Sequence, residues 1–300
     1  MSYLSSAIPA LHRLRLPFSR DQLVLLVAAV NEIILGLDVY LAHNISGTIV
    51  PYEWIPIIFG PLAGVLLLLV GLVALRFRPF ATRLATVIFF SSVIVGVLGS
   101  YFHLIRASLP AAPFGQQLSV DLLVWAPPIL GPISFAGVAI LGLSAAWIED
   151  PVDSGILVLG HSRRLHLPYS KTRGYLFLVS LGILAALISS VLDHARTGFS
   201  NAWLWLPVTA GAFGTIVAAL LGTADSPSRR DIQTYVGAML LMILVGLVGA
   251  YLHVQVVLTA DNQFIFERFL RGAPFLAPMQ FSNLGLLGLL VLLDPTERKS

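Results

Sequence analysis

Apolar residues in this chain gather into long runs, which are separated by short segments rich in charged residues, proline and glycine. A helix needs about 20 apolar residues to cross the ~30 Å hydrocarbon core of a membrane, and eight runs come close to that length. The pattern predicts an all-α integral membrane protein with eight transmembrane helices. Their expected ranges are 22–43, 54–75, 84–104, 122–147, 174–194, 203–223, 233–255 and 273–293.

The composition supports a membrane protein and excludes several kinds of site. Of the 300 residues, 57% are apolar and 11% are charged, and the mean hydropathy is +0.88. A soluble domain has about 25% charged residues. Because the chain has no cysteine, disulfides, thiolate metal ligands and iron–sulfur clusters held by cysteine are excluded. The expected partner is the lipid bilayer, and the net charge of +3 gives no reason to expect nucleic acid.

Lysine and arginine concentrate on alternate connections, which sets the expected orientation. Cytoplasmic loops of membrane proteins carry an excess of both residues. Of the 18, 14 lie in the N-terminal segment, in the second, fourth and sixth connections and in the C-terminal tail, and the other four are Arg106, Arg196, Arg268 and Arg271. We therefore expect both termini in the cytoplasm. The expected division is a basic cytoplasmic segment 1–21, a four-helix repeat 22–147, a cytoplasmic linker 148–173, a second four-helix repeat 174–293 and a cytoplasmic tail 294–300.

Two stretches 150 residues apart share the pattern V-G-x-x-G-x-Y-x-H. They are VGVLGSYFH at 95–103 and VGLVGAYLH at 245–253. A shift of 151 residues also pairs rarer residues of the earlier helices: His43 with His194, Trp54 with Trp205, Pro56 with Pro207 and Gly60 with Gly211. The repeat predicts an internal duplication into two parallel four-helix bundles related by an axis along the membrane normal.

Four histidines fall at the outer ends of the odd-numbered predicted helices and form two duplicated pairs, His43 with His103 and His194 with His253. In a bundle with sequential connections the first and third helices face each other diagonally, so each pair is expected to meet at one depth. Residues four and seven positions before a histidine lie on its helical face. The glycines at these positions are Gly96 and Gly99 before His103, and Gly246 and Gly249 before His253.

A haem b held by two imidazoles fits this pattern best. Its axial ligands come from two helices, and its flat ring needs the clearance that glycines provide. Guanidinium groups one turn or less beyond the histidines are expected to pair with the haem propionates. The predicted cofactor site therefore also includes Tyr101, Tyr251, Arg106 and Arg196.

Two other interpretations of the histidines stay open. A copper or zinc ion would use the same four histidines as metal ligands, completed by Glu53 or Asp193. Alternatively, small residues spaced four apart mediate close helix packing, and tyrosine and histidine near helix ends serve as interfacial residues. The second interpretation needs no cofactor.

Glu32 is the one carboxylate near the middle of a predicted span. Ionisable residues inside a membrane are functional candidates by default, so Glu32 is a candidate for a proton path. It lies eleven residues, or three helical turns, before His43 and therefore on the same face. Its counterpart in the repeat is Ile183, which is apolar. A buried group that only satisfies its own hydrogen bonds is the alternative.

Eight helices in two halves, each with a histidine pair at similar depth, resemble the layout of haem A synthases, which modify and carry haem in respiratory membranes. The resemblance covers the whole chain at the level of architecture and implies a duplicated haem-binding bundle. Our hypothesis is a protein of a prokaryotic cytoplasmic (inner) membrane that serves electron transfer or respiratory-complex assembly, as a component of a haem- or metal-dependent oxidoreductase. Its expected partners are other membrane subunits or a redox partner at the outer face. A cofactor-free transporter or structural subunit is the alternative.

Overall fold

The computed structural model describes residues 17–45, 47, 49–159, 163–258, 265, 267 and 274–295. Helices dominate this part of the chain. They are α2 (Arg20–Ile45), α3 (Trp54–Ala74), α4 (Arg78–Arg106), α5 (Val120–Trp125), α6 (Leu130–Ala146), α7 (Lys171–Ala195), α8 (Trp205–Thr223), α9 (Arg229–Leu258) and α11 (Leu276–Leu290), with 3-10 turns η2 (Pro51–Glu53) and η3 (Ala202–Leu204). Several expected basic residues lie outside the described residues: Arg13, Arg15, Arg268, Arg271, Arg298 and Lys299.

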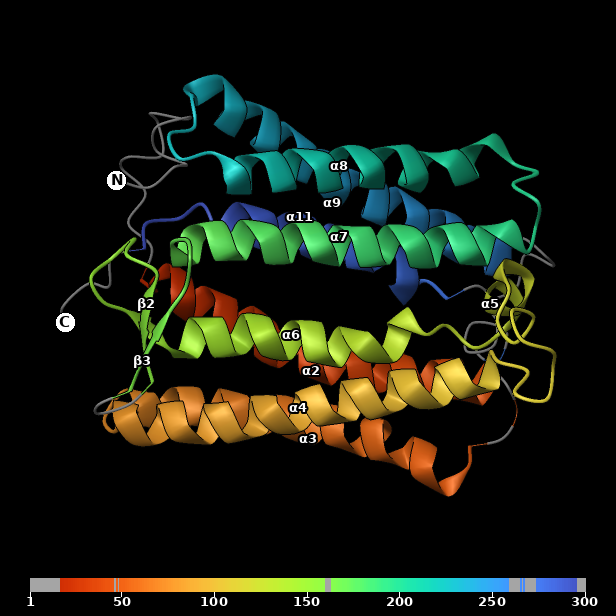
Figure 1. The fold of residues 1–300 in the computed structure, drawn as a ribbon, viewed down its shortest axis with the longest axis horizontal. Helices are drawn as coiled ribbons and strands as arrows, with labels where there is room; N and C mark the ends of the chain where they lie inside the picture. Colours follow the sequence, from red (N-terminus) through yellow and green to blue (C-terminus); the bar gives the residue numbers. More distant parts are fainter. Residues whose placement is uncertain are drawn as a thin grey trace.

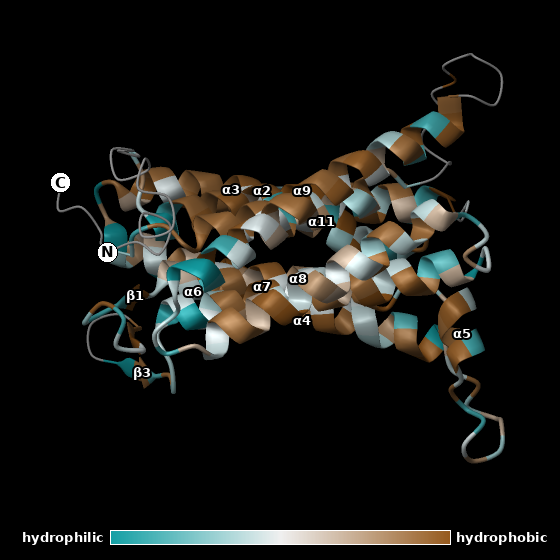
Figure 2. Cartoon of the chain, turned by 90° about the horizontal axis from the view of Figure 1, so that it is seen from above, coloured by the Kyte–Doolittle hydropathy of each residue, from teal (hydrophilic) through white to brown (hydrophobic). Residues whose placement is uncertain are grey.

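Among the described residues, six helical segments are long and apolar enough to cross a membrane, so the protein is an integral membrane protein. They are Arg20–Ile45, Pro51–Ala74, Arg78–Arg106, Lys171–Ala195, Ala202–Thr223 and Arg229–Leu258. Figure 2 shows hydrophobic residues along the middle of these helices and hydrophilic residues gathered toward their ends. The two other expected spans form shorter apolar helices, α6 with 17 residues and α11 with 15.

Prolines explain why the predicted helix 122–147 is divided into α5 and α6. A proline lacks the N–H that continues a helix, and it disfavours helical geometry in the residue before it. Ala126, which precedes Pro127 and Pro128, is accordingly extended, with φ −75° and ψ 167°. The helix resumes only at Leu130.

The expected linker 148–173 contains a small antiparallel sheet, so the all-α prediction is incomplete there. Its strands are β1 (Ile148–Glu149), β2 (Ile156–Val158) and β3 (Arg164–His166), in the order β1-β2-β3. Ile148 lies opposite Val158, and Leu157 lies opposite Leu165. The Glu149 carboxylate fixes the turn after β1, because it accepts hydrogen bonds from the backbone N–H groups of Asp153, Gly155 and Lys171.

Eight of the nine described helices, all except α5, form two groups of four. In the first half (α2, α3, α4 and α6), each helix packs on the next and α6 returns to α2. The second half (α7, α8, α9 and α11) repeats this order, and α11 returns to α7. The halves meet through α6 with α7, α2 with α11, and α5 with α7 (Figure 1). We call the end with the sheet and the first turns of α2 and α7 the sheet end, and the opposite end, where those helices finish with His43 and His194, the histidine end.

The second half has the larger continuous apolar core. Its cluster of buried side chains includes Tyr175, Ile183, Tyr235 and Met242, each at 0% exposure. The first half contributes a separate, smaller cluster around Phe89, also at 0% exposure. Gly142 of α6 makes room for the Phe89 ring, since a Cβ atom there would lie 2.1 Å from it.

Buried charged groups join the halves at the sheet end. Arg20 of α2 donates to Thr172 Oγ1 of α7 at 2.7 Å, and Lys171 of α7 forms an ion pair with Asp21 of α2. Asp21 also accepts from Tyr175 Oη at 3.1 Å and from Arg20 Nε at 3.2 Å. The Arg20 and Lys171 side chains are each only 1% exposed. A buried ion pair is tolerated only with such additional hydrogen bonds, so this contact fixes how the halves meet.

Candidate functional site

His43 and His103 come together at the histidine end of the first half. Their ring centres lie 6.1 Å apart, and the ring planes are inclined at 71°. Nδ1 of His43 lies 2.8 Å from the carbonyl oxygen of Val39, and Nδ1 of His103 lies 2.9 Å from that of Pro128. Because a carbonyl oxygen only accepts, Nδ1 carries the proton on each ring and Nε2 is the ligand nitrogen of the neutral side chain. Ligating histidines are typically oriented by such a hydrogen bond.

A carboxylate and a guanidinium lie beside this pair. Glu53 Oε1 is 3.7 Å from His43 Nε2 and 3.4 Å from an Arg106 guanidinium nitrogen. The backbone N–H of Val50 donates to Glu53 Oε2 at 3.0 Å, which holds the carboxylate in place. The Glu53 side chain is 8% exposed and that of Arg106 is 56% exposed. Arg106 therefore pairs with Glu53.

The second histidine pair is arranged differently. Nδ1 of His253 lies 2.9 Å from the carbonyl oxygen of Pro274, as His103 does from that of Pro128. His194, however, has its Nδ1 3.3 Å from Ser190 Oγ, and its ring packs edge-on against Phe199 with centres 6.1 Å apart. The sequence correctly pairs His43 with His103 in space, whereas an aromatic neighbour occupies one side of His194.

The glycines before the histidines face the next helix. A Cβ atom at Gly99 would lie 2.7 Å from Pro132 Cβ of α6, and one at Gly249 would lie 2.8 Å from Pro278 Cβ of α11. Gly96 and Gly246 likewise lie against the backbone of α6 and α11. The clearance that we expected for a flat macrocycle is filled by these helices. The glycines allow close helix packing.

The two tyrosines of the repeated pattern point outward. Tyr101 is 56% exposed and Tyr251 is 61% exposed, and Tyr251 Oη accepts a hydrogen bond from Gln255. Exposed tyrosines near the end of a transmembrane helix are typical of the membrane interface.

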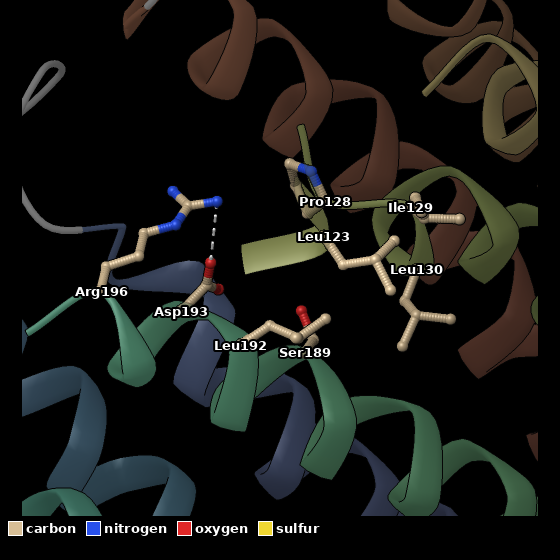
Figure 3. A pocket seen from close by; sticks show the side chains of 8 residues that line it. All are labelled: Leu123, Pro128, Ile129, Leu130, Ser189, Leu192, Asp193 and Arg196. Atoms are coloured by element: carbon tan, nitrogen blue, oxygen red, sulfur yellow. Dashed lines mark ion pairs between the residues drawn. The ribbon is translucent and has the colours of Figure 1, made fainter. Parts of the chain in front are cut away.

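Arg196 fastens the second half to the first. Its guanidinium donates to the carbonyl oxygens of Val124 at 2.6 Å and Ala126 at 2.9 Å, and lies 3.8 Å from Asp193 Oδ1. These carbonyls belong to the end of α5, where the helix stops and leaves acceptors unpaired. Figure 3 shows the Asp193–Arg196 ion pair beside a small hollow between the halves. The hollow is lined by Leu123, Pro128, Ile129, Leu130, Ser189, Leu192, Asp193 and Arg196.

Within the described residues, no three histidine, cysteine, aspartate or glutamate side chains are grouped to hold a metal ion. A zinc site needs four ligands, at least three of them usually from the protein. A haem iron needs only two protein ligands, because the macrocycle supplies the other four. His43 and His103 meet that lower requirement.

Glu32 lies at the centre of the first half. It is 0% exposed, and its Oε1 lies 2.5 Å from Ser92 Oγ of α4, which is also 0% exposed. Ser92 Oγ lies 3.3 Å from the carbonyl oxygen of Phe135 in α6. Three helices therefore meet at this carboxyl group.

The sequence did not predict the sheet-end ion network of Arg20, Asp21, Lys171 and Thr172. A signal was present, because the same shift of 151 residues that aligns the histidines pairs Arg20 with Lys171. Arg20 of α2 contacts Thr172, the residue after Lys171. Lys171 of α7 contacts Asp21, the residue after Arg20.

Comparison with known protein families, with characterised proteins and with solved structures finds no match for this chain. The site must therefore be interpreted from its own geometry.

Proposed function

We propose that this protein is a haem b protein of a prokaryotic cytoplasmic membrane, with one haem between His43 and His103 at the outer face. In this proposal all eight apolar helices cross the membrane, both termini are cytoplasmic, and the two halves arose by duplication. The bound haem would supply reversible one-electron chemistry, and a redox partner or another membrane subunit would exchange electrons with it.

Contacts at the sheet end support the duplication. Arg20 of the first half contacts Thr172 of the second, and Lys171 of the second contacts Asp21 of the first. Under the shift of 151 residues these are the same contact made in both directions, as across a two-fold axis. The hydrogen bonds of His103 to Pro128 and of His253 to Pro274 repeat in the same way. They align Pro128 with Pro274.

The separation of the two histidine rings carries the haem proposal. An imidazole nitrogen binds a metal at about 2.0–2.1 Å, so two imidazoles on opposite sides of one ion have ring centres roughly 6 Å apart. The ring centres of His43 and His103 have this separation, at 6.1 Å, and both Nδ1 atoms are bonded to backbone carbonyls.

Absorption spectroscopy of the detergent-purified full chain tests the proposal. We expect a Soret band that shifts on reduction, and about one iron per chain. His43→Ala and His103→Ala should each abolish the band. His253→Ala is the matched control, since it removes an equivalent histidine and should leave the band unchanged.

Each other outcome has a defined meaning. Absence of both a Soret band and iron would overturn the haem proposal. Two irons per chain, falling to one in His253→Ala, would overturn the single-site form and restore the second pair as a ligand set. Copper or zinc in elemental analysis without a Soret band would also overturn the haem proposal.

A cofactor-free packing subunit is the second candidate function. The observation in its favour is that α6 and α11 fill the glycine faces, so that close helix packing explains the repeated pattern. It predicts that all four histidine-to-alanine variants fold and that none has a chromophore to lose.

A further inference from the structure

The buried carboxyl group of Glu32 presents a hydrogen-bonding problem with a definite answer. Ser92 Oγ lies 2.5 Å from Glu32 Oε1 and 3.3 Å from the carbonyl oxygen of Phe135. A hydroxyl group has one hydrogen to donate, and a carbonyl oxygen can only accept. Ser92 therefore cannot donate to both neighbours.

The protonation state of Glu32 decides which groups donate in these two hydrogen bonds. If Glu32 is neutral, its O–H donates to Ser92 Oγ, and Ser92 donates to the carbonyl oxygen of Phe135. Both contacts are then hydrogen bonds. If Glu32 is ionised, Ser92 must donate to it and the contact with Phe135 is lost.

The second oxygen of Glu32 points to the same answer. Oε2 is buried and has no hydrogen-bond partner among the described residues. None of the ion pairs formed by described residues includes Glu32. A negative charge on Oε2 would therefore be uncompensated at membrane depth, which costs far more than an unpaired neutral oxygen.

Glu149 shows how this chain holds a buried carboxylate that has donors on both oxygens. Its Oε1 accepts from the backbone N–H groups of Gly155 and Lys171, both at 2.8 Å, and its Oε2 accepts from that of Asp153 at 3.1 Å. Glu149 is 8% exposed and Glu32 is 0% exposed. The more deeply buried carboxyl group thus has fewer donors.

We propose that Glu32 binds one exchangeable proton at the centre of the first half, and that this neutral acid is the donor to Ser92. The ligand of this site is the proton itself, so the site needs no cavity. The second half has no equivalent, because Ile183 and Met242 stand at the positions of Glu32 and Ser92. The proposal is independent of any cofactor at the histidines.

Infrared spectroscopy of the purified full chain at neutral pH tests this site. A protonated carboxyl group absorbs in the C=O stretching region, apart from carboxylates. We expect such a band, a shift of it on exchange into D₂O, and its complete loss in Glu32→Gln. Asp121→Asn, in an exposed position of α5, is the control that should leave the band unchanged.

A second variant keeps the test decisive if Glu32→Gln does not fold. Ser92→Ala removes the acceptor of the Glu32 proton, so the band should persist at a different frequency. The proposal is overturned if Glu32→Gln removes intensity from the carboxylate region, or if Ser92→Ala leaves the band at its original frequency. Neither measurement uses a chromophore, so failure here is distinguishable from failure of the haem proposal.

Discussion

The two halves share one arrangement of helices but carry different residues at two equivalent places, the centre of each half and the histidine end. At the centre, the first half has Glu32 and Ser92, whereas the second has Ile183 and Met242. At the histidine end, the counterpart of Glu53 is Leu204. The first half thus carries polar groups at positions where the second half has a larger apolar core. In the proposed duplication, one copy would serve stability while the other copy would carry the buried polar groups.

Substitution in the sheet-end ion network between the halves should lower the free energy of unfolding most. Asp21→Asn removes the carboxylate that pairs with both Arg20 and Lys171 and leaves these two buried cations without their ion-pair partner. We expect a loss of about 3–5 kcal/mol in the free energy of unfolding. Denaturant unfolding in detergent micelles measures it. Asp225→Asn is the control, because Asp225 is 89% exposed in its pair with Arg173 and should contribute less than about 1 kcal/mol. Equal stability of the two variants would show that the contact between the halves does not depend on these ion pairs.

Exchanging the residues at the centres of the two halves tests whether a buried carboxyl group is stable only in the first half. Ile183→Glu places a carboxyl group in the apolar centre of the second half, where Ile183 is 0% exposed, and should cost about 3 kcal/mol. Adding Met242→Ser should recover part of that loss, by about 0.5–3 kcal/mol in a double-mutant cycle.

The reverse exchange is the matched control. Glu32→Ile with Ser92→Met gives the first half the apolar pair of the second and should leave its stability equal or higher. If Ile183→Glu were tolerated without loss, the two centres would be interchangeable and the distinction between the halves would fail.

The glycine faces should respond alike in both halves, with the smallest effect. Gly99→Ala and Gly249→Ala place a Cβ atom 2.7 and 2.8 Å from a proline Cβ. We expect each to lose about 1–3 kcal/mol, as in overpacking of a core. Gly237→Ala, where nothing lies within 4 Å of the added atom, should instead gain about 0.5–1 kcal/mol. Thermal unfolding in detergent compares the three, and unequal losses at Gly99 and Gly249 would show that the equivalent faces pack differently.

Hydropathy predicts the helices well because the signal is summed over many residues. It misses the break at Pro127 and Pro128 because leucine and valine on both sides keep the mean hydropathy high. It also misses the sheet, whose strands have two or three residues each and depend on Glu149 to hold their turn.

The histidine site is predictable only in part. The repeat identifies His43 and His103, and the structure brings them together. Spacing alone cannot tell whether a glycine face receives a macrocycle or a neighbouring helix, since both need the same absence of side chains. Nor can it place Arg196, whose guanidinium bonds a carbonyl 72 residues away in the chain.

The sheet-end contact has a consequence for the order of synthesis. Asp21 and its neighbour Arg20 are made early, but Lys171 follows Asp21 by 150 residues. At 5–20 residues per second a ribosome needs roughly 8–30 s for that stretch. During this interval the start of α2 has only the local Arg20–Asp21 pair and cannot yet be buried between the halves. Completion of the first half in the cell therefore waits for the first turn of α7 to emerge.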